Sequence, residues 1–89
     1  MMLNQRQTIS ERAFVEMVVW RVPSPGSGSS HGFKYRLAFV VNGSCVLRYD
    51  NEEGKGDHKH IAGREVPYVF TTPSALLDDF WNEVDNWRL

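Results

Sequence analysis

Two neighbouring stretches rich in apolar and aromatic residues, 33–41 (FKYRLAFVV) and 44–50 (SCVLRYD), are separated by the dipeptide Asn42-Gly43. Asn-Gly is the dipeptide best suited to the two left-handed positions of a type I′ turn, which joins antiparallel strands through two residues. The sequence therefore predicts a β-hairpin at this point. No other feature constrains the fold of the chain as strongly.

The same turn predicts which side chains share a face of the hairpin, because directly opposed residues of two antiparallel strands point to the same side. Counting outward from the pair Val41 and Ser44 places four polar residues on one face at the open end: Lys34, Arg36, Tyr49 and Asn51. That face continues toward the turn as apolar surface through Ala38, Val40, Cys45 and Leu47. The opposite face is predicted to enter the core through Phe33, Tyr35, Leu37, Phe39 and Val46.

Two further segments have the composition of strands. Residues 12–22 (RAFVEMVVWRV) lack helical periodicity and are rich in Val and aromatic residues, with a predicted apolar face of Ala13, Val15, Met17 and Val19. Residues 65–70 (EVPYVF) predict a short strand, in which Pro67 favours an edge or an early position. By contrast, residues 1–11 are expected to form a mobile N-terminal segment, and the Ser-, Gly- and Pro-rich residues 23–32 a flexible loop.

A C-terminal amphipathic helix is predicted for residues 72–88, with Thr72 as its N-cap and Pro73 at its first position. Its apolar positions fall on one helical stripe, formed by Leu76, Leu77, Phe80, Trp81, Val84 and Trp87. We therefore expect an α+β fold in which this helix packs on a small antiparallel, meander-like sheet of about four strands. Because the chain has 89 residues, 42% of them hydrophobic, it has material for one modest core, and residues 1–89 are expected to form a single domain.

Charge and cysteine content exclude several classes of protein. A formal net charge of -1 excludes a globally basic nucleic-acid binder, although a local patch can still bind phosphate. Cys45 is the sole cysteine and has no intramolecular disulfide partner, which indicates a reducing compartment. No run approaches the roughly 18 apolar residues of a membrane span, and the first residues lack the pattern of a signal peptide. We expect a soluble, cytoplasmic protein that does not bind membranes.

The segment 54–60 (GKGDHKH) carries the residues best suited to catalysis or ligand binding. If its end is extended, His58 and His60 point to one side and Lys59 to the other, because strand side chains alternate. Histidine titrates near physiological pH, so two neighbouring imidazoles can supply a general base and a general acid in one turnover. His58 and His60 are therefore the predicted catalytic pair.

Cations around this segment can bind phosphate. Lys55 lies between two glycines that let the backbone approach a ligand, and Lys34 and Arg36 belong to the predicted polar face of the hairpin. Tyr49 is predicted to position a base or to hydrogen-bond a phosphate, and the predicted substrate-binding set is completed by Asn51 and Asp57. Together these groups fit a metal-independent ribonuclease that needs no cofactor, because it requires a base, an acid and fixed cations.

Three alternatives remain open at this level. The segment 54–60 also fits a solvated loop whose charges keep a sheet edge soluble. The His-x-His pattern on a strand can present two metal ligands, with Asp57 or His31 as a third. Finally, the chain fits a non-enzymatic interaction module that binds a protein or a nucleic acid.

The run from Tyr35 to Trp81 resembles the TumE-like family of bacterial toxins from type II toxin-antitoxin systems, and the resemblance extends back to about residue 12. Members share a YDN-x-x-GKGDH-x-H core, an E-x-P-Y-x-F strand and a Leu-Leu-x-Asp-Phe helix. The core is carried here by Tyr49, Asp50, Asn51, Gly54, Lys55, Gly56, Asp57, His58 and His60. The strand and helix motifs are carried by Glu65, Pro67, Tyr68, Phe70, Leu76, Leu77, Asp79 and Phe80.

This resemblance implies a small toxin that is encoded beside a helix-turn-helix antitoxin, which binds and neutralises it. An RNA target is suggested by the chemistry of the histidine segment and by analogy with other small β-sheet toxins that cleave RNA. The antitoxin is expected either to cover the cationic face or to pair with an exposed strand edge. Edge pairing by residues 12–22 would also be a route to a homodimer.

Overall fold

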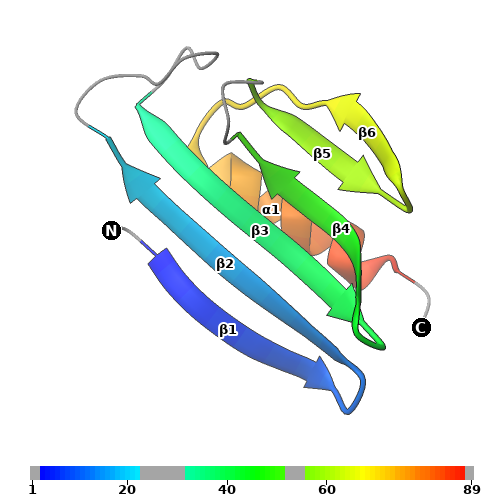
Figure 1. The fold of residues 1–89 in the computed structure, drawn as a ribbon. Coiled ribbons are helices and arrows are strands. Elements are labelled where there is room, and N and C mark those ends of the chain that lie inside the picture. Colours follow the sequence, from blue (N-terminus) through cyan, green and yellow to red (C-terminus); the bar gives the residue numbers. More distant parts are fainter. Residues whose placement is uncertain (1–2, 23–31, 52–55, 88–89) are drawn as a thin grey trace.

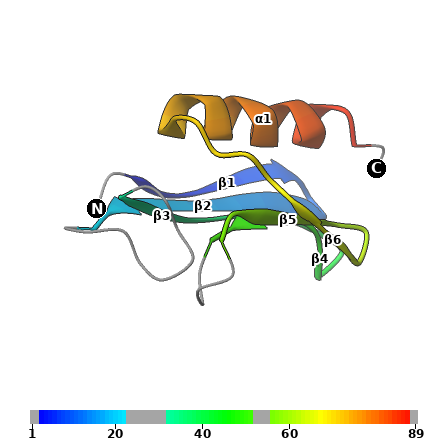
Figure 2. The same ribbon diagram turned by 90° about the horizontal axis from the view of Figure 1, so that it is seen from above.

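The computed structural model describes residues 3–22, 32–51 and 56–87, which form a β-sheet covered on one face by a helix (Figure 1). Six antiparallel strands follow one another across the sheet in chain order: β1 (Leu3–Ser10), β2 (Ala13–Arg21), β3 (Phe33–Val41), β4 (Ser44–Asp50), β5 (His58–Ile61) and β6 (Arg64–Pro67). Figure 2 shows the helix α1 (Pro73–Asp85) on one side of the sheet, and we call the opposite side the open face. The α+β class and the meander are confirmed, but the sheet has six strands rather than about four.

One additional strand is β1, which lies in the segment 1–11 that the sequence predicts to be mobile. Leu3 is paired with Val19 on β2, and the pairing continues along the strand although β1 has little apolar pattern. Only Leu3 among its residues packs against the core, and the others are exposed. The predicted edge strand at residues 12–22 is therefore an interior strand, and β1 provides that edge of the sheet.

The other additional strand is β5, which carries both histidines of the segment singled out for its chemistry. Ala62 and Gly63 have positive φ angles of 49° and 82° and turn the chain tightly from β5 into β6. The strand predicted over 65–70 begins one residue earlier, at Arg64, and ends at Pro67. Pro67 lies in an edge strand, as predicted, because β6 has a single neighbour in the sheet.

The hairpin between β3 and β4 forms around the predicted turn. Asn42 and Gly43 have φ angles of 52° and 79°, the left-handed values that an Asn-Gly type I′ turn requires. Val41 is paired with Ser44, as predicted. The register then shifts between Phe39 and Val40, because β4 carries one extra residue.

Because of this β-bulge, several side chains of the hairpin lie on the opposite side of the sheet from the one predicted. A bulge turns the side chains that follow it to the opposite side of the strand. Leu47 and Tyr49 therefore face α1 and are almost completely buried, and Asn51 follows them, whereas Lys34 and Arg36 lie on the open face. The prediction that Lys34, Arg36, Tyr49 and Asn51 share one face of the hairpin is therefore wrong. Burying a side chain such as that of Leu47 contributes about 1.5–3 kcal/mol, which favours the bulged register.

The core lies between the sheet and α1. The predicted apolar face of β2 is buried, with Ala13, Val15, Met17 and Val19. Thr72 Oγ1 accepts a hydrogen bond from the Ala75 N–H at 3.1 Å, and Pro73 begins the helix, as predicted. The helix ends at Asp85 rather than at residue 88. Its apolar stripe packs on the sheet through the buried side chains of Leu76, Phe80 and Val84.

Some predictions fall on residues that the structure does not describe. The predicted flexible loop lies outside the described residues except for Gly32, and so do His31 and Lys55. Among the described residues, α1 is too short and too polar to cross a membrane.

Candidate active site on the open face of the sheet

Charged and polar side chains gather on the open face over β4, β5 and β6. Asp50 on β4 is paired with His58 on β5, and in the adjacent row Arg48 is paired with His60 and His60 with Glu65. Because residues two apart on a strand point to the same side, both rows face away from α1. We call these five residues the histidine cluster. The prediction that His58 and His60 share one side of an extended segment is confirmed.

His58 is the most enclosed member of the histidine cluster, with 7% of the residue exposed. Its Nε2 lies 2.7 Å from Oδ1 of Asp50 and 3.5 Å from Oε2 of Glu65, and its Nδ1 lies 3.0 Å from the carbonyl oxygen of Gly56. Carbonyl oxygens and ionised carboxylates only accept hydrogen bonds, so each nitrogen pairs well only if it carries a hydrogen. The surroundings of His58 therefore suit an imidazolium, which can donate a proton.

His60 is more accessible and has different neighbours. Its side chain is 31% exposed, and its Nε2 lies 3.2 Å from Oε2 of Glu65 and 3.1 Å from Nη2 of Arg48. A guanidinium only donates hydrogen bonds and an ionised carboxylate only accepts them. The Nε2 atom of His60 consequently has a partner both with and without its hydrogen, which suits a group that takes up and releases a proton.

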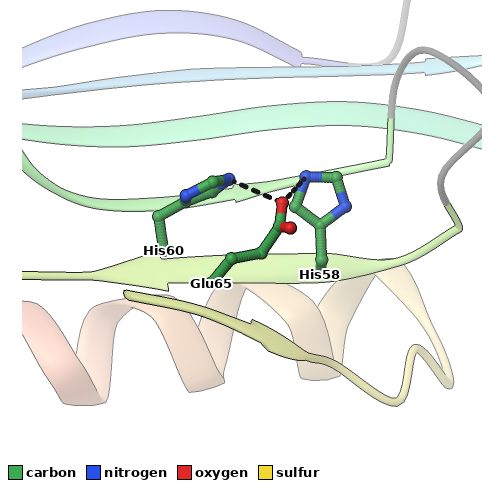
Figure 3. Close-up of side chains that lie close together, drawn as sticks. All are labelled: His58, His60 and Glu65. Carbon is green, nitrogen blue, oxygen red and sulfur yellow. Dashed lines mark ion pairs between the residues drawn. The ribbon is translucent and has the colours of Figure 1, made fainter. Parts of the chain in front are cut away.

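The two imidazoles lie side by side. Their ring centroids are 5.3 Å apart with an interplanar angle of 76°. Figure 3 shows both rings on the same side of β5, with the carboxylate of Glu65 reaching between them from β6. One ligand atom from each of these three residues lies within 4.8 Å of the others, so His58, His60 and Glu65 are also the candidates among the described residues to hold a metal ion.

Asp50 links the buried histidine to Arg48. It contacts His58 through Oδ1, and its Oδ2 lies 2.8 Å from Nε of Arg48. The contact with Arg48 is an ion pair without an aligned N–H···O hydrogen bond. Arg36 on β3 is the exposed cross-strand partner of Asp50 and extends the row of charges.

A depression of about 220 Å³ beside the cluster is lined by Asp57, His58, Glu65, Val66 and Pro67.

Tyr49, which the sequence predicts to contact the substrate, lies on the side of the sheet that faces α1. It is 1% exposed, and its hydroxyl donates a hydrogen bond to Oε1 of Glu83 at 2.8 Å. The Nζ atom of Lys59 lies 2.6 Å from the same oxygen. Burial, and then the hydrogen bond to Glu83, raise the pKa of Tyr49 well above its usual value. Tyr49 is therefore separated from the histidine cluster by the sheet.

Asn51 and Asp57, also predicted to bind substrate, hold the chain that follows β4 against β3. The fully buried Asn51 accepts a hydrogen bond from the Tyr35 N–H at 3.1 Å and donates one to the Phe33 carbonyl at 2.8 Å. Asp57 Oδ1 accepts a hydrogen bond from the Tyr35 hydroxyl at 2.7 Å. Burial, and then this hydrogen bond, raise the pKa of Tyr35.

Arg36 and Lys34, two of the cations predicted to bind phosphate, differ in their position relative to the histidine cluster. Arg36 lies in the row of Asp50 and His58, through a register that differs from the predicted one. Lys34 lies on the same face, opposite Trp20 and beyond the last described pair of β3 with β4.

Three members of the histidine cluster have no role in the sequence-based site: Arg48, Asp50 and Glu65. Asp50 and Glu65 stand inside recognisable motifs, and strand alternation relates each to a histidine once the pairing is known. The pairing depends on the short turn between β5 and β6, and the face on which the pairs lie depends on the bulge between β3 and β4. No local signal in the sequence specifies the bulge.

Comparison with known families gives a result that agrees with the motifs. A family model described as Toxin TumE matches residues 3–88, nearly the whole chain. The comparisons with curated proteins and with solved structures found no match. The family match includes β1, which lies before the residues that carry the resemblance in the sequence analysis. The chain therefore belongs to the TumE toxin family.

Proposed function

We propose that this toxin cleaves RNA by metal-independent acid–base catalysis and that it is the toxin of a type II toxin-antitoxin system. The observation that carries the proposal is the pair of imidazoles on the open face, 5.3 Å apart, whose ring nitrogens have different hydrogen-bond partners. His58 faces acceptors only and serves as the general acid. His60, which has a partner in both protonation states, serves as the general base.

The proposed reaction transfers two protons around one phosphodiester. His60 removes the proton of the RNA 2′-hydroxyl, whose oxygen attacks phosphorus and forms a 2′,3′-cyclic phosphate. The bond from phosphorus to the 5′-oxygen breaks, and His58 gives its proton to that oxygen. Glu65, 3.2 Å from His60 Nε2, stabilises the imidazolium that forms there, and Asp50 orients His58.

Cations on the open face stabilise the charge that develops on the phosphate. Arg48 lies nearest to the histidines, and Arg36 and Lys34 extend the positive charge along β3. We propose that Lys55, which follows β4 in the sequence, adds a further phosphate contact. The contacts of Tyr49, Asn51 and Asp57 support a different role from the predicted substrate binding: these residues maintain the sheet beneath the site.

A helix-turn-helix antitoxin is the proposed partner, and the reaction would take place in the cytoplasm. Covering the open face would block the histidine cluster directly. Pairing with the exposed edge of β1 is the alternative mode, and the same edge would serve a homodimer.

The test is induction of the gene without its neighbour, comparing wild type with the His58→Ala/His60→Ala double variant while growth and RNA integrity are followed. We expect growth arrest and RNA fragments with 2′,3′-cyclic phosphate ends for wild type, and neither for the double variant. His31→Ala is the matched histidine control and should retain both effects. Circular dichroism must show that the double variant folds. Growth arrest and fragmentation that persist in the folded double variant would contradict the catalytic assignment.

A non-enzymatic interaction module is the second candidate. It is favoured by the enclosure of His58 and by the ion pairs that engage both histidines. Under this function the histidines would affect folding or affinity, but no RNA product would form. Growth arrest with intact RNA, or no arrest at all, would favour this candidate.

A further inference from the structure

The nitrogens of the two histidines converge on one carboxylate oxygen. Nε2 of His60 lies 3.2 Å and Nε2 of His58 lies 3.5 Å from Oε2 of Glu65. In a tetrahedral zinc site with bonds of about 2.0–2.1 Å, neighbouring ligand atoms are about 3.3 Å apart. Two of the three separations between ligand atoms are therefore close to those that one zinc ion needs, and all three atoms lie within 4.8 Å of one another (Figure 3).

The types of ligand also suit zinc. Two imidazoles and one carboxylate form a three-ligand set that leaves a fourth position open. Asp50 Oδ1 lies 2.7 Å from Nε2 of His58 and so adjoins this set of ligands. A set of nitrogen and carboxylate ligands favours Zn²⁺ over Mg²⁺ or Ca²⁺, which prefer oxygen ligands alone.

The surroundings orient His58 as a ligand. Its Nδ1 lies 3.0 Å from the Gly56 carbonyl oxygen, and such a hydrogen bond from the second ring nitrogen fixes the tautomer of metal-binding histidines. Gly56 has a φ of 77°, a conformation that residues with a side chain rarely adopt. His58, His60 and Glu65 also project from paired strands, β5 and β6, which limits the movement needed to bind an ion.

One group opposes the ion. Nη2 of Arg48 lies 3.1 Å from Nε2 of His60, so a cation at this nitrogen meets a like charge. The Arg48 side chain is 35% exposed and can turn toward solvent. This opposition makes a specific prediction, because removing the guanidinium should strengthen metal binding.

We propose that His58, His60 and Glu65 form a binding site for one Zn²⁺ ion, and that the bound ion excludes protons from both Nε2 atoms. The ion would thus act as an inhibitor of acid–base chemistry at the histidine cluster. The existence of the metal site does not rest on the proposed RNA cleavage, because binding can be measured without RNA.

The test is titration of the purified, EDTA-treated full-length chain with ZnCl₂ by calorimetry, and with Co²⁺ by its visible absorption. We expect one ion per chain. Glu65→Gln and His60→Gln should each weaken binding by at least about tenfold, the lower range of effects seen even for groups that only support a ligand. Arg48→Gln should strengthen binding.

Two control variants keep this test sharp. Glu16→Gln removes one exposed carboxylate from the same face, and His31→Gln removes the remaining histidine of the chain. Neither should change the affinity. The proposal is overturned if no ion binds at millimolar concentration, if Glu65→Gln binds like wild type, or if His31→Gln abolishes binding. If the protein binds zinc but cleaves no RNA, the proposed metal site stands and only the proposed nuclease activity is refuted.

Discussion

Nε2 of His58 lies 2.7 Å from Oδ1 of Asp50, its cross-strand partner on β4, and both residues are more than nine-tenths buried. The two residues meet on the open face only because the bulge in β4 shifts Asp50 to that side. The same shift sends Tyr49 into the core. One irregularity in one strand thus determines both the histidine cluster and the packing beneath it.

Asp50→Asn should lower the free energy of unfolding by about 3 kcal/mol near neutral pH, because it leaves a buried histidine without the carboxylate it faces. Urea unfolding followed by circular dichroism measures the change. Glu16→Gln, at an exposed position on the same face, is the matched control and should change stability by less than about 0.5 kcal/mol. Equal effects of the two substitutions would show that the pair with His58 does not stabilise the fold.

Asn51→Ala should destabilise the fold by about 2 kcal/mol or more, because the backbone N–H of Tyr35 and the carbonyl of Phe33 lose a buried partner. Asn51→Asp keeps the acceptor but loses the donor and adds a buried charge, so it should also be destabilising. Thermal and urea unfolding measure both variants. If Asn51→Ala is fully stable and lowers only RNA binding, Asn51 binds substrate, as the sequence predicts.

Stability should fall as the pH rises above about 10, the ordinary pKa of tyrosine. Each of the three tyrosines donates a hydrogen bond to a carboxylate, in the pairs Tyr35–Asp57, Tyr49–Glu83 and Tyr68–Asp79. Burial and then these bonds raise the pKa of each tyrosine in the folded state. The unfolded chain therefore releases protons that the folded chain retains, so the stabilisation is complete below about pH 10 and is lost above it.

Urea unfolding between about pH 8 and pH 11 tests this prediction. Lysines also titrate in this range, so the comparison that matters is between wild type and the Tyr35→Phe/Tyr49→Phe double variant. The dependence of stability on pH should be shallower in the double variant. An unchanged slope would mean that these tyrosines ionise as readily in the folded chain as in the unfolded one.

Arg36→Ala and Arg48→Ala should each weaken binding of single-stranded RNA and reduce the salt dependence of that binding. The slope of log affinity against log salt should decrease by about 0.7 for each lost phosphate contact. Fluorescence anisotropy over a range of salt concentrations measures the slope. Arg64→Ala is the matched control, because Arg64 is exposed and pairs with Ile61 on the side of the sheet that faces α1. A decrease of the same size for Arg64→Ala would show that the open face is not the RNA-binding surface.

The sequence by itself determined the elements that depend on local preferences. Asn42-Gly43 forms a turn because these two residues tolerate positive φ, and Thr72 caps the helix because its hydroxyl reaches a free backbone N–H. Strand alternation likewise placed His58 and His60 on one side of the chain. Each of these features is specified within a few consecutive residues.

Only the tertiary structure decided the register of β4, the pairing of β1 and the residues that surround the two histidines. The bulge is favoured because it buries Leu47 and Tyr49 beneath α1, a helix that lies far along the chain. β1 is held by backbone pairing with β2, which leaves no apolar pattern to detect. Asp50 and Glu65 meet His58 through strand pairing. Local sequence could not specify these contacts, because their energies depend on groups that come together only when the whole sheet forms.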